Sequence, residues 1–370
     1  MKSIAIIPGS TNLGIKEIKE PFINSPDEIK LKVLQVGICG TDREMAEGGR
    51  ADAPKGRKEL IIGHEMFGQV VETGTMVNSV KPGDYGVFTV RRGCNECKAC
   101  KNNRSDMCYS GKYTERGIKG ADGFQAEYVV DTAQYFIKVP AAIKELGVLT
   151  EPMSVAAKAI DEAIMLQQAR LKEFDLNESW LKGKKALVAG IGAIGLMAAF
   201  ALRLKGAEVT GVDIVDKDSL RARILQEIGG RYVDGRVLNI VNVDEECGEF
   251  DFVFEATGIA MLQIELIDTL ATNGIYVATG IPAGKRPMTI DAAHVLQQLV
   301  LKNQIILGSV NASVDHYRMA VDYMEESSTK WPGVIKQTIT ESVPFKDIGK
   351  AFDSHHANEI KIVIDWISVA

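Results

Sequence analysis

The stretch that decides the fold of this 370-residue chain is Lys185-Ala186-Leu187-Val188-Ala189-Gly190-Ile191-Gly192-Ala193-Ile194-Gly195. A short apolar strand leads into the spacing G-x-G-x-x-G, and an apolar helical pattern follows as far as Leu204. In this context the glycines let the backbone approach a pyrophosphate, whose charge the helix N-terminus favours. The alternative is a glycine turn used only for tight packing. The residues predicted to contact a dinucleotide here are Gly190, Gly192, Ala193, Ile194 and Gly195.

The acid expected to bind the adenosine ribose stands at the end of the next strand, residues 208–213. Its separation from the glycines is close to the usual spacing of about 20 residues. Asp213 can accept hydrogen bonds from both ribose hydroxyls and would repel a 2′-phosphate, and no arginine follows it directly. The sequence therefore predicts NAD as cofactor in preference to NADP, with NADP still possible.

Strands and helices continue to alternate after this acid. Apolar strands are predicted at 251–255, 274–280 and 305–310, with a helix near 291–301. Parallel strands joined by helices imply a doubly wound sheet. Thr257 and Gly280, at the ends of the first two strands, are added to the predicted cofactor-binding residues.

The first third of the chain has the period-2 pattern of strands, without intervening helices. Ile29, Leu31 and Val33 alternate with lysines, as in a half-buried strand. Further strands are predicted at 67–72, 126–130 and 135–139. Strands separated by turns predict a barrel-like β domain. A helical pattern at 315–324 and a closing strand at 360–364 suit a return of the chain to this domain.

Composition excludes several classes of protein. The chain is long enough for two domains, because one core rarely exceeds about 250–300 residues. A net charge of −6 argues against nucleic acid as a main partner. No apolar run approaches the roughly 18 residues of a membrane span, and the first residues lack the apolar core of a signal peptide. We therefore expect a cytoplasmic protein without a membrane partner.

Four of the six cysteines crowd into residues 94–108 with the spacing C-x-x-C-x-x-C-x7-C. Four thiolates close a tetrahedral zinc site with no open position, which makes such a site structural. Disulfides or free thiols are the alternative, and a cytoplasmic setting disfavours disulfides. Cys247 has the character of an ordinary surface-loop residue. The predicted ligands of the structural zinc are Cys94, Cys97, Cys100 and Cys108.

A second candidate metal site combines C-G-T-D at 39–42 with G-H-E at 63–65. Cys39 and His64 are zinc-ligand types, and the neighbouring hydroxyl and carboxylates can relay protons or orient ligands. Each piece alone has a structural alternative, since Cys39 could be a small buried residue and His64 a satisfied core histidine. Glu151, before a predicted helix at 154–166, is either a helix cap or a further zinc ligand.

Taken together, these motifs resemble those of the zinc-containing medium-chain alcohol dehydrogenase superfamily, nearly from end to end of the chain. The resemblance rests on the segments 39–42, 63–65, 94–108, 151–152 and 190–195 and on the order of the domains. It implies an α/β fold in two parts. A GroES-like β-rich catalytic domain would comprise residues 1–156 and 309–370, with a structural zinc lobe at 94–108. A Rossmann domain with a doubly wound parallel sheet would comprise 157–308.

The resemblance also implies roles for individual residues. Cys39 and His64 match the family's catalytic zinc ligands, and Glu65 and Glu151 match carboxylates that complete the site in one branch. Thr41 matches the hydroxyl that touches the substrate oxygen. We expect it to accept a proton and pass it to Glu44 or to ribose hydroxyls. The predicted catalytic residues are therefore Thr41, Glu44 and Glu65.

Within the superfamily, the run at 39–44 is most similar to archaeal-type glucose (aldose 1-) dehydrogenases. In that branch Glu115 matches a carboxylate that binds sugar hydroxyls, and Asn311 a polar group near substrate and nicotinamide. Val90 and Leu301 depart from the asparagine and histidine that such enzymes can carry, which would weaken discrimination among sugars. The predicted substrate-binding residues are Thr41, Glu115, Glu151 and Asn311.

The expected activity is zinc-dependent hydride transfer from C1 of an aldose, glucose or a related sugar, to NAD(P), which gives the lactone. One alternative is an NAD-dependent polyol or secondary alcohol dehydrogenase. Another is a non-catalytic nucleotide-binding protein with structural zinc only, acting as a redox sensor or scaffold. By analogy with the family, we expect a homodimer or homotetramer with a small sugar as substrate.

Overall fold

The computed structural model describes residues 1–172, 179–238, 243–282, 287–353 and 358–367. The chain divides into two compact units, and each is interrupted in the sequence by the other. Unit 1 comprises Met1–Ser154, Asn311–Glu325 and Ile339–Ala370. Unit 2 comprises Val155–Val310 and Glu326–Thr338.

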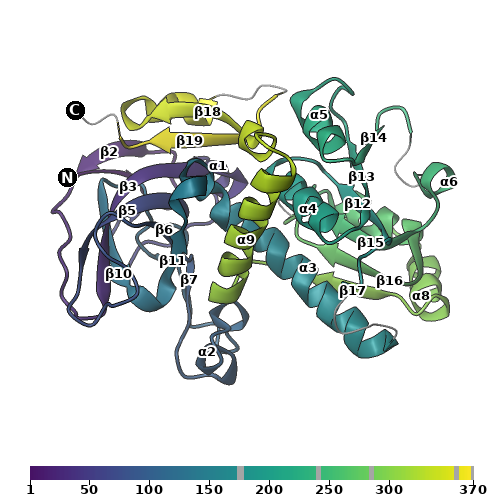
Figure 1. Ribbon diagram of the computed structural model, residues 1–370, viewed down its shortest axis with the longest axis horizontal. Coiled ribbons are helices and arrows are strands. Elements are labelled where there is room, and N and C mark those ends of the chain that lie inside the picture. Colours follow the sequence, from purple (N-terminus) through teal and green to yellow (C-terminus); the bar gives the residue numbers. More distant parts are fainter. Residues whose placement is uncertain (173–178, 239–242, 283–286, 354–357, 368–370) are drawn as a thin grey trace. The chain divides into compact units, whose positions relative to one another are not determined.

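The main sheet of unit 1 has seven strands in the order β11-β6-β5-β3-β19-β18, and β10 also pairs with β3 (Figure 1). These strands are β3 (Glu28–Ile38), β5 (Glu65–Thr73), β6 (Tyr85–Phe88), β10 (Tyr128–Thr132), β11 (Phe136–Val139), β18 (Ile339–Pro344) and β19 (Lys361–Asp365). The predicted strands at 67–72, 126–130, 135–139 and 360–364 are thereby confirmed within two residues at each end. The β-rich domain is confirmed with them.

β3 is the central strand of unit 1, because it pairs with β5, β10 and β19. Its apolar residues Ile29, Leu31 and Val33 are fully buried, as their alternation with lysines predicts. β19 pairs antiparallel with β3, with Val363 opposite Gly37, so the C-terminal strand runs beside Cys39. A Cβ on Gly37 would clash with the Glu65 carboxylate, so the glycine lets the Glu65 side chain cross the strand.

Smaller elements complete unit 1. Two three-stranded sheets have the orders β2-β1-β4 and β7-β8-β9. Their strands are β1 (Lys2–Ile6), β2 (Leu13–Glu17), β4 (Leu60–Ile61), β7 (Arg91–Arg92), β8 (Thr114–Arg116) and β9 (Gly120–Ala121). The helices are α1 (Gly40–Ala46), α2 (Lys98–Lys101) and α10 (Ile348–Asp353), with 3-10 turns η1 (Ser105–Met107), η2 (Ala133–Tyr135), η3 (Ala141–Leu149) and η7 (Phe345–Asp347). Two longer helices, α3 (Thr150–Leu171) and α9 (Val314–Lys330), contribute residues to both units.

Unit 2 is built on a parallel six-stranded sheet in the order β14-β13-β12-β15-β16-β17 (Figure 1). The strands are β12 (Lys185–Ala189), β13 (Glu208–Asp213), β14 (Arg231–Asp234), β15 (Phe250–Glu255), β16 (Leu270–Ala278) and β17 (Ile305–Gly308). The helices are α4 (Ala193–Leu204), α5 (Leu220–Glu227), α6 (Val243–Cys247), α7 (Ala260–Glu265) and α8 (Ala292–Leu301), with 3-10 turns η5 (Leu266–Thr269) and η6 (Ile335–Thr338). The doubly wound parallel sheet predicted from the sequence is confirmed.

The order of this sheet reverses between β12 and β15, so a ligand is expected at the carboxyl ends of these two strands. α4 begins there, with Gly192 as its N-cap. A Cβ on Gly195 would clash with the carbonyl oxygen of Gly190, so this glycine allows the helix to pack closely on the strand. A Cβ on Gly192 would meet nothing within 4 Å, so the backbone there is open to a ligand.

Two segments differ from what the sequence indicates. Glu326–Thr338 belongs to unit 2, where the Trp331 ring packs edge-on against Phe200 with 5.9 Å between centroids. The predicted boundaries place this segment with the first domain, and these boundaries stay a prediction. Cys247 is not in a loop but ends α6, where it is half-buried and its carbonyl accepts a hydrogen bond from Lys185.

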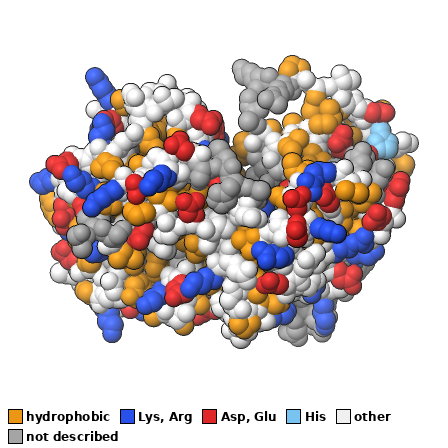
Figure 2. Space-filling view, turned by 90° about the horizontal axis from the view of Figure 1, so that it is seen from above, with side chains coloured by type: hydrophobic (Ala, Val, Ile, Leu, Met, Phe, Trp, Pro, Cys, Tyr) orange, Lys and Arg blue, Asp and Glu red, His pale blue; other side chains and the backbone are white. Residues whose placement is uncertain are grey.

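The surface carries charges of both signs. On the face drawn in Figure 2, lysines and arginines are interspersed with aspartates and glutamates, and no continuous basic stretch is visible on that face. Among the described residues, no helix is both long enough and apolar enough to cross a membrane.

Candidate active site and cofactor-binding residues

The thiol and the imidazole of the predicted catalytic metal site face each other. Cys39 is the N-cap of α1, and the Asp42 carboxylate accepts a hydrogen bond from its backbone N–H at 3.0 Å. The Cys39 Sγ lies 3.1 Å from Nε2 of His64, which directly precedes β5. Tetrahedral zinc would hold such a sulfur and nitrogen ~3.5 Å apart, so this pair fits a zinc ion.

Asp42, the last residue of the C-G-T-D segment, lies beside the imidazole of His64, although it was not among the predicted catalytic or metal-binding residues. Its Oδ1 lies 3.6 Å from His64 Nδ1, and neither atom has a hydrogen-bond partner among the described residues. A carboxylate behind the ring fixes which nitrogen faces the metal. Burial raises the pKa of the Cys39 thiol. Burial lowers the pKa of His64, but Cys39 and Asp42 outweigh it and raise that pKa well above its usual value, so metal binding would release protons.

Glu65 is the first residue of β5 and is fully buried beside this pair. Its two carboxylate oxygens accept hydrogen bonds from Nζ of Lys361, at 2.7 and 2.6 Å. Lys361 is also buried and begins β19, a segment for which the sequence pattern predicts only a strand. The candidate ligand atoms of Cys39, His64 and Glu65 lie within 4.8 Å of one another. The ion pair thus compensates a carboxylate that adjoins the metal site.

Glu151 lies in the first turn of α3 and is half-buried. Burial is the main cause that raises its pKa to about 7, with His64 opposing the increase and Glu65 adding to it. These influences place Glu151 within electrostatic reach of His64, although it is outside the group whose ligand atoms lie within 4.8 Å. A role in metal or substrate binding stays a prediction.

The two proposed proton-relay residues lie on α1. The backbone N–H of Thr41 donates to Cys39 Sγ at 3.3 Å, which fixes this residue beside the thiol. Glu44 is one turn further on, 47% of its side chain is exposed, and it pairs with Arg50 at 3.4 Å. Thr41 is therefore placed next to the metal site, whereas Glu44 is in contact with solvent.

The four clustered cysteines converge in a separate lobe. All four sulfurs lie within 4.8 Å of one another, and those of Cys94 and Cys100 are 3.9 Å apart. Tetrahedral zinc with four thiolates requires ~3.8 Å between sulfurs. A hydrogen bond with Ser110 is the main cause that lowers the pKa of Cys94 to about 6, which favours its thiolate form. The geometry therefore fits a closed zinc site.

Glu115 and Asn311, both predicted to bind substrate, are in direct contact although 196 residues separate them. Asn311 Nδ2 donates to Glu115 Oε1 at 2.9 Å. The same oxygen accepts from Arg91 at 2.8 Å, and Arg91 is held in turn by the carbonyl of Asp106 at 2.7 Å. The structure thus joins Glu115, Asn311 and Arg91 in one polar cluster of unit 1, and the role of this cluster in substrate binding stays a prediction.

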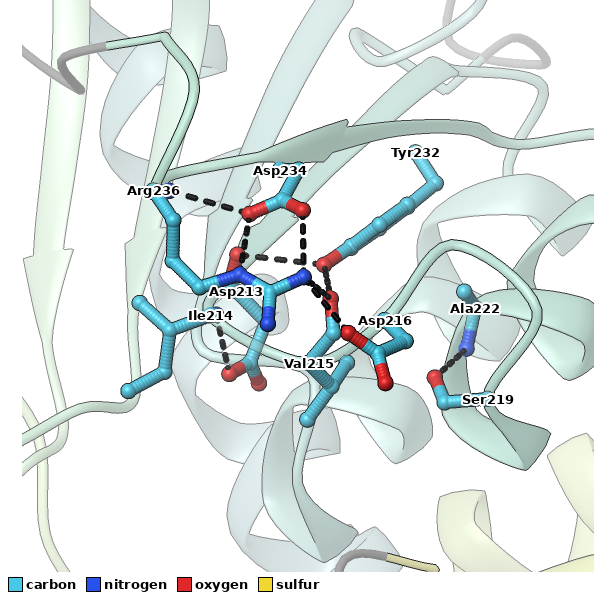
Figure 3. A network of polar contacts seen from close by, with 9 residues as sticks. All are labelled: Asp213, Ile214, Val215, Asp216, Ser219, Ala222, Tyr232, Asp234 and Arg236. Carbon is cyan, nitrogen blue, oxygen red and sulfur yellow. Dashed lines mark hydrogen bonds and ion pairs between the residues drawn. The ribbon is translucent and has the colours of Figure 1, made fainter.

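The predicted ribose-binding acid braces the glycine-rich turn. Asp213 Oδ2 accepts from the backbone N–H of Ile191 at 2.9 Å, and Oδ1 accepts from Ile214 at 2.7 Å. Arg236 reaches the loop after β13 from the end of β14, where it pairs with Asp234 at 2.6 Å and Asp216 at 2.8 Å (Figure 3). Arg221 also approaches Asp213, at 3.8 Å. Neither arginine could be identified from the sequence as a neighbour of this acid, because neither directly follows Asp213.

Comparison with known protein families agrees with this architecture. The alcohol dehydrogenase GroES-like domain matches residues 25–141, and the glucose dehydrogenase C-terminus matches residues 144–366. A β-rich unit with two cysteine-containing metal sites and a dinucleotide-type sheet define a zinc-containing medium-chain dehydrogenase. The chain belongs to this superfamily, in the branch of the glucose dehydrogenases.

Individual relatives cover the whole chain. Glucose 1-dehydrogenase of Thermoproteus tenax is 37% identical over 98% of this chain and 99% of its own length. Glucose 1-dehydrogenase 2 of Vulcanisaeta moutnovskia is 38% identical over 99% of both chains. The solved structure of Haloferax mediterranei glucose dehydrogenase in complex with NADP, Zn and gluconolactone has a TM-score of 0.88 at 30% identity, with 100% of both chains covered. The family resemblance found in the sequence is confirmed.

Proposed function

We propose that this protein oxidises an aldose, glucose or a related sugar, at C1 with NAD(P) to give the lactone. The observation that carries the proposal is the group Cys39, His64 and Glu65, gathered within 4.8 Å in a chain that matches glucose dehydrogenases along its length. A Zn ion bound there would supply Lewis acidity to the C1 hydroxyl and favour its loss of a proton. The donor types and their separations fit that ion.

Separate residues of the chain would then transfer the proton and moderate the charge of the metal site. Thr41, fixed beside the thiol by its N–H, would accept the proton from the sugar hydroxyl. Glu44 is solvent-exposed and would pass that proton to water. Glu65, compensated by Lys361, would limit the positive charge of the metal site and so ease ligand exchange.

Sugar recognition would rest on the cluster of Glu115, Asn311 and Arg91. Glu115 Oε1 is already shared by Asn311 and Arg91, so the cluster is rigid before a sugar arrives. The remaining lone pairs and amide groups of this cluster would form hydrogen bonds with sugar hydroxyls. Val90 is buried and apolar, so it cannot form a hydrogen bond with a sugar hydroxyl. Because this reduces discrimination among sugars, we expect activity on several aldoses.

The activity is tested by a spectrophotometric screen of aldoses, polyols and secondary alcohols, each with NAD and with NADP. Turnover of aldoses with lactone as product is the expected result. Faster turnover of polyols would favour the alternative dehydrogenase. No turnover with any substrate, together with one zinc per chain in place of two, would favour a nucleotide-binding sensor.

For the cofactor we propose a preference for NAD, supported by the position of Asp213 at the end of β13. Arg236 is the main opposing feature, since an arginine at this loop could bind a 2′-phosphate. Its guanidinium is shared between Asp216 and Asp234, and the hydrogen bond from Arg236 holds the pKa of Asp234 to about 2 (Figure 3). These two carboxylates thus offset the positive charge of Arg236, which a 2′-phosphate would need for binding.

Replacing Asp213 with asparagine should therefore change cofactor choice. The amide keeps an acceptor for the Ile191 N–H but removes the negative charge. We expect NAD⁺ affinity to fall about tenfold and NADP⁺ affinity to stay or rise, because an acceptor of the ribose hydroxyls is weakened and repulsion of phosphate is relieved. Dissociation constants from calorimetry, with exposed Glu245→Gln as charge control, measure this. An equal loss for both cofactors would assign Asp213 to bracing the turn alone.

We also propose a homo-oligomer, formed through the surface of α8 and β17. α8 has an apolar sequence but no buried residue, and Leu296, Val300 and Leu301 are 61, 73 and 71% exposed. β17 is the edge strand and pairs only with β16 in the described part of the chain. A second copy of this chain suits such a surface because two identical edges can pair about a twofold axis.

Charge at this surface should dissociate the oligomer. The Val300→Glu variant is expected to halve the mass measured by light scattering, because it buries an unpaired carboxylate in each interface. Val237→Glu, on a valine that is 86% exposed after β14 at the other edge of the sheet, is the matched control. A wild-type protein that is monomeric at micromolar concentration would contradict the proposal.

The cytoplasm remains the proposed location. The four clustered cysteines are free thiols in the structure, and a reducing compartment keeps such ligands available for zinc. Retention of two zinc ions by protein purified from the cytoplasmic fraction would support this location.

A further inference from the structure

Glu255, the last residue of β15, carries a carboxylate that is completely buried. Its Oε1 accepts three hydrogen bonds, from Thr257 N at 2.7 Å, Thr257 Oγ1 at 2.6 Å and Gly258 N at 2.8 Å. Its Oε2 accepts from Gln263 Nε2 at 2.7 Å and from Gly280 N at 3.3 Å. None of these partners carries a charge, so the carboxylate is stabilised by five neutral donors.

These hydrogen bonds join the loops that follow two neighbouring strands. Residues 256–258 leave β15, and residues 279–280 leave β16. The loops are in close contact, because a Cβ on Gly280 would clash with the backbone nitrogen of Gly258. Thr257 also packs against the glycine-rich turn, since a Cβ on Gly190 would lie 3.0 Å from its methyl group. One side chain therefore sets the positions of both loops.

These loops lie where a bound dinucleotide would contact them. The inference rests on the proposed function at this step, because that function requires a dinucleotide. A dinucleotide crosses the sheet at the reversal between β12 and β15, with its pyrophosphate at the start of α4. Asp213 stands at the end of β13, so the adenosine half would lie on the β13 side of this reversal. The nicotinamide half must then lie beyond β15 and β16, where Glu255 holds both loops.

We propose that Glu255 is a positioning residue for the nicotinamide half of the cofactor. It touches no part of the cofactor itself but fixes the backbone of 256–258 and 279–280 in the form that receives this half. A buried carboxyl group in this position is costly unless those loops are closed on it and supply its hydrogen-bond donors. The adenosine half depends on Asp213 and is independent of Glu255.

The Glu255→Gln variant tests whether Glu255 affects the nicotinamide half of the cofactor and not the adenosine half. A glutamine amide turns one of the two acceptors into a donor, so at least one loop N–H loses its partner. By calorimetry without sugar, we expect NAD⁺ to bind about tenfold more weakly, which matches the loss of one hydrogen bond to a charged group. ADP, which has the adenosine and both phosphates but no nicotinamide riboside, should bind within about twofold of wild type.

Glu245→Gln, on the exposed face of α6, controls for the change in net charge. Equal weakening of NAD⁺ and ADP would mean that Glu255 only maintains the fold, and unchanged NAD⁺ binding would mean that it has no role. Either result overturns the proposal. If Glu255→Gln does not fold, Gln263→Leu removes one donor to the same carboxylate and should show the same selective loss at smaller size. Sugar is absent from these measurements, so a failure of the proposed aldose activity would be seen separately in the substrate screen.

Discussion

Replacement of Cys39 is expected to abolish aldose oxidation while leaving dinucleotide binding almost intact. In the Cys39→Ser variant the hydroxyl can still accept the hydrogen bond that caps α1, but it is a poor zinc ligand. Lewis-acid stabilisation of a developing alkoxide is worth several kcal/mol, so kcat should fall on the order of a thousandfold. The glycine-rich turn belongs to the other unit, and NAD⁺ affinity should change by less than about twofold.

The measurement is kcat together with zinc content and the dissociation constant of NAD⁺. Zinc should fall from two ions per chain to one, because the cluster at 94–108 is separate from Cys39. Cys247→Ser, a half-buried thiol at the end of α6, is the matched control and should keep full activity and both ions. A parallel loss of turnover and NAD⁺ affinity would show that Cys39 is only a structural residue.

The parts of the fold that could be predicted are those decided by neighbours in the sequence. The alternation in β3 shows directly which face is buried, and the strand Glu208–Asp213 has the bounds that its apolar run indicates. The four cysteines converge as their spacing predicts, because one short segment of the chain supplies all of them. In each case the physical cause lies within a few residues, where periodicity and spacing can report it.

Long-range partners could not be predicted in the same way. Lys361 meets Glu65 across 296 residues, and in the sequence it is merely the first residue of an apolar strand. Arg236 reaches the loop after β13 only because β14 is the neighbour of β13 in the sheet. A pattern of residue types shows which face of an element is buried but not which side chain lies opposite. Buried charges in regular strands, such as Lys361, are therefore the signal that would have prompted a search for a partner.

Because Lys361 neutralises a buried carboxylate, Lys361→Met is expected to be a severe substitution. Methionine fills a similar volume but leaves the Glu65 carboxylate, which is 1% exposed, without its only ion-pair partner among the described residues. Breaking one partner of a buried pair typically costs about 3–5 kcal/mol, and we expect this loss in the free energy of unfolding measured in urea. The paired variant Lys361→Met with Glu65→Gln should recover most of it, because neither charge is then buried.

Lys138→Met provides the comparison that separates burial from charge. Lys138 pairs with Asp84 at 3.0 Å, but 53% of its side chain is exposed, and surface pairs contribute about 0–1 kcal/mol. If both lysine variants lost the same small amount, Glu65 would have to find another donor or be neutral in the folded protein. If the double variant regained stability and zinc but not turnover, the negative charge of Glu65 would be needed in the reaction itself, and Lys361 would be the residue that makes this buried charge tolerable.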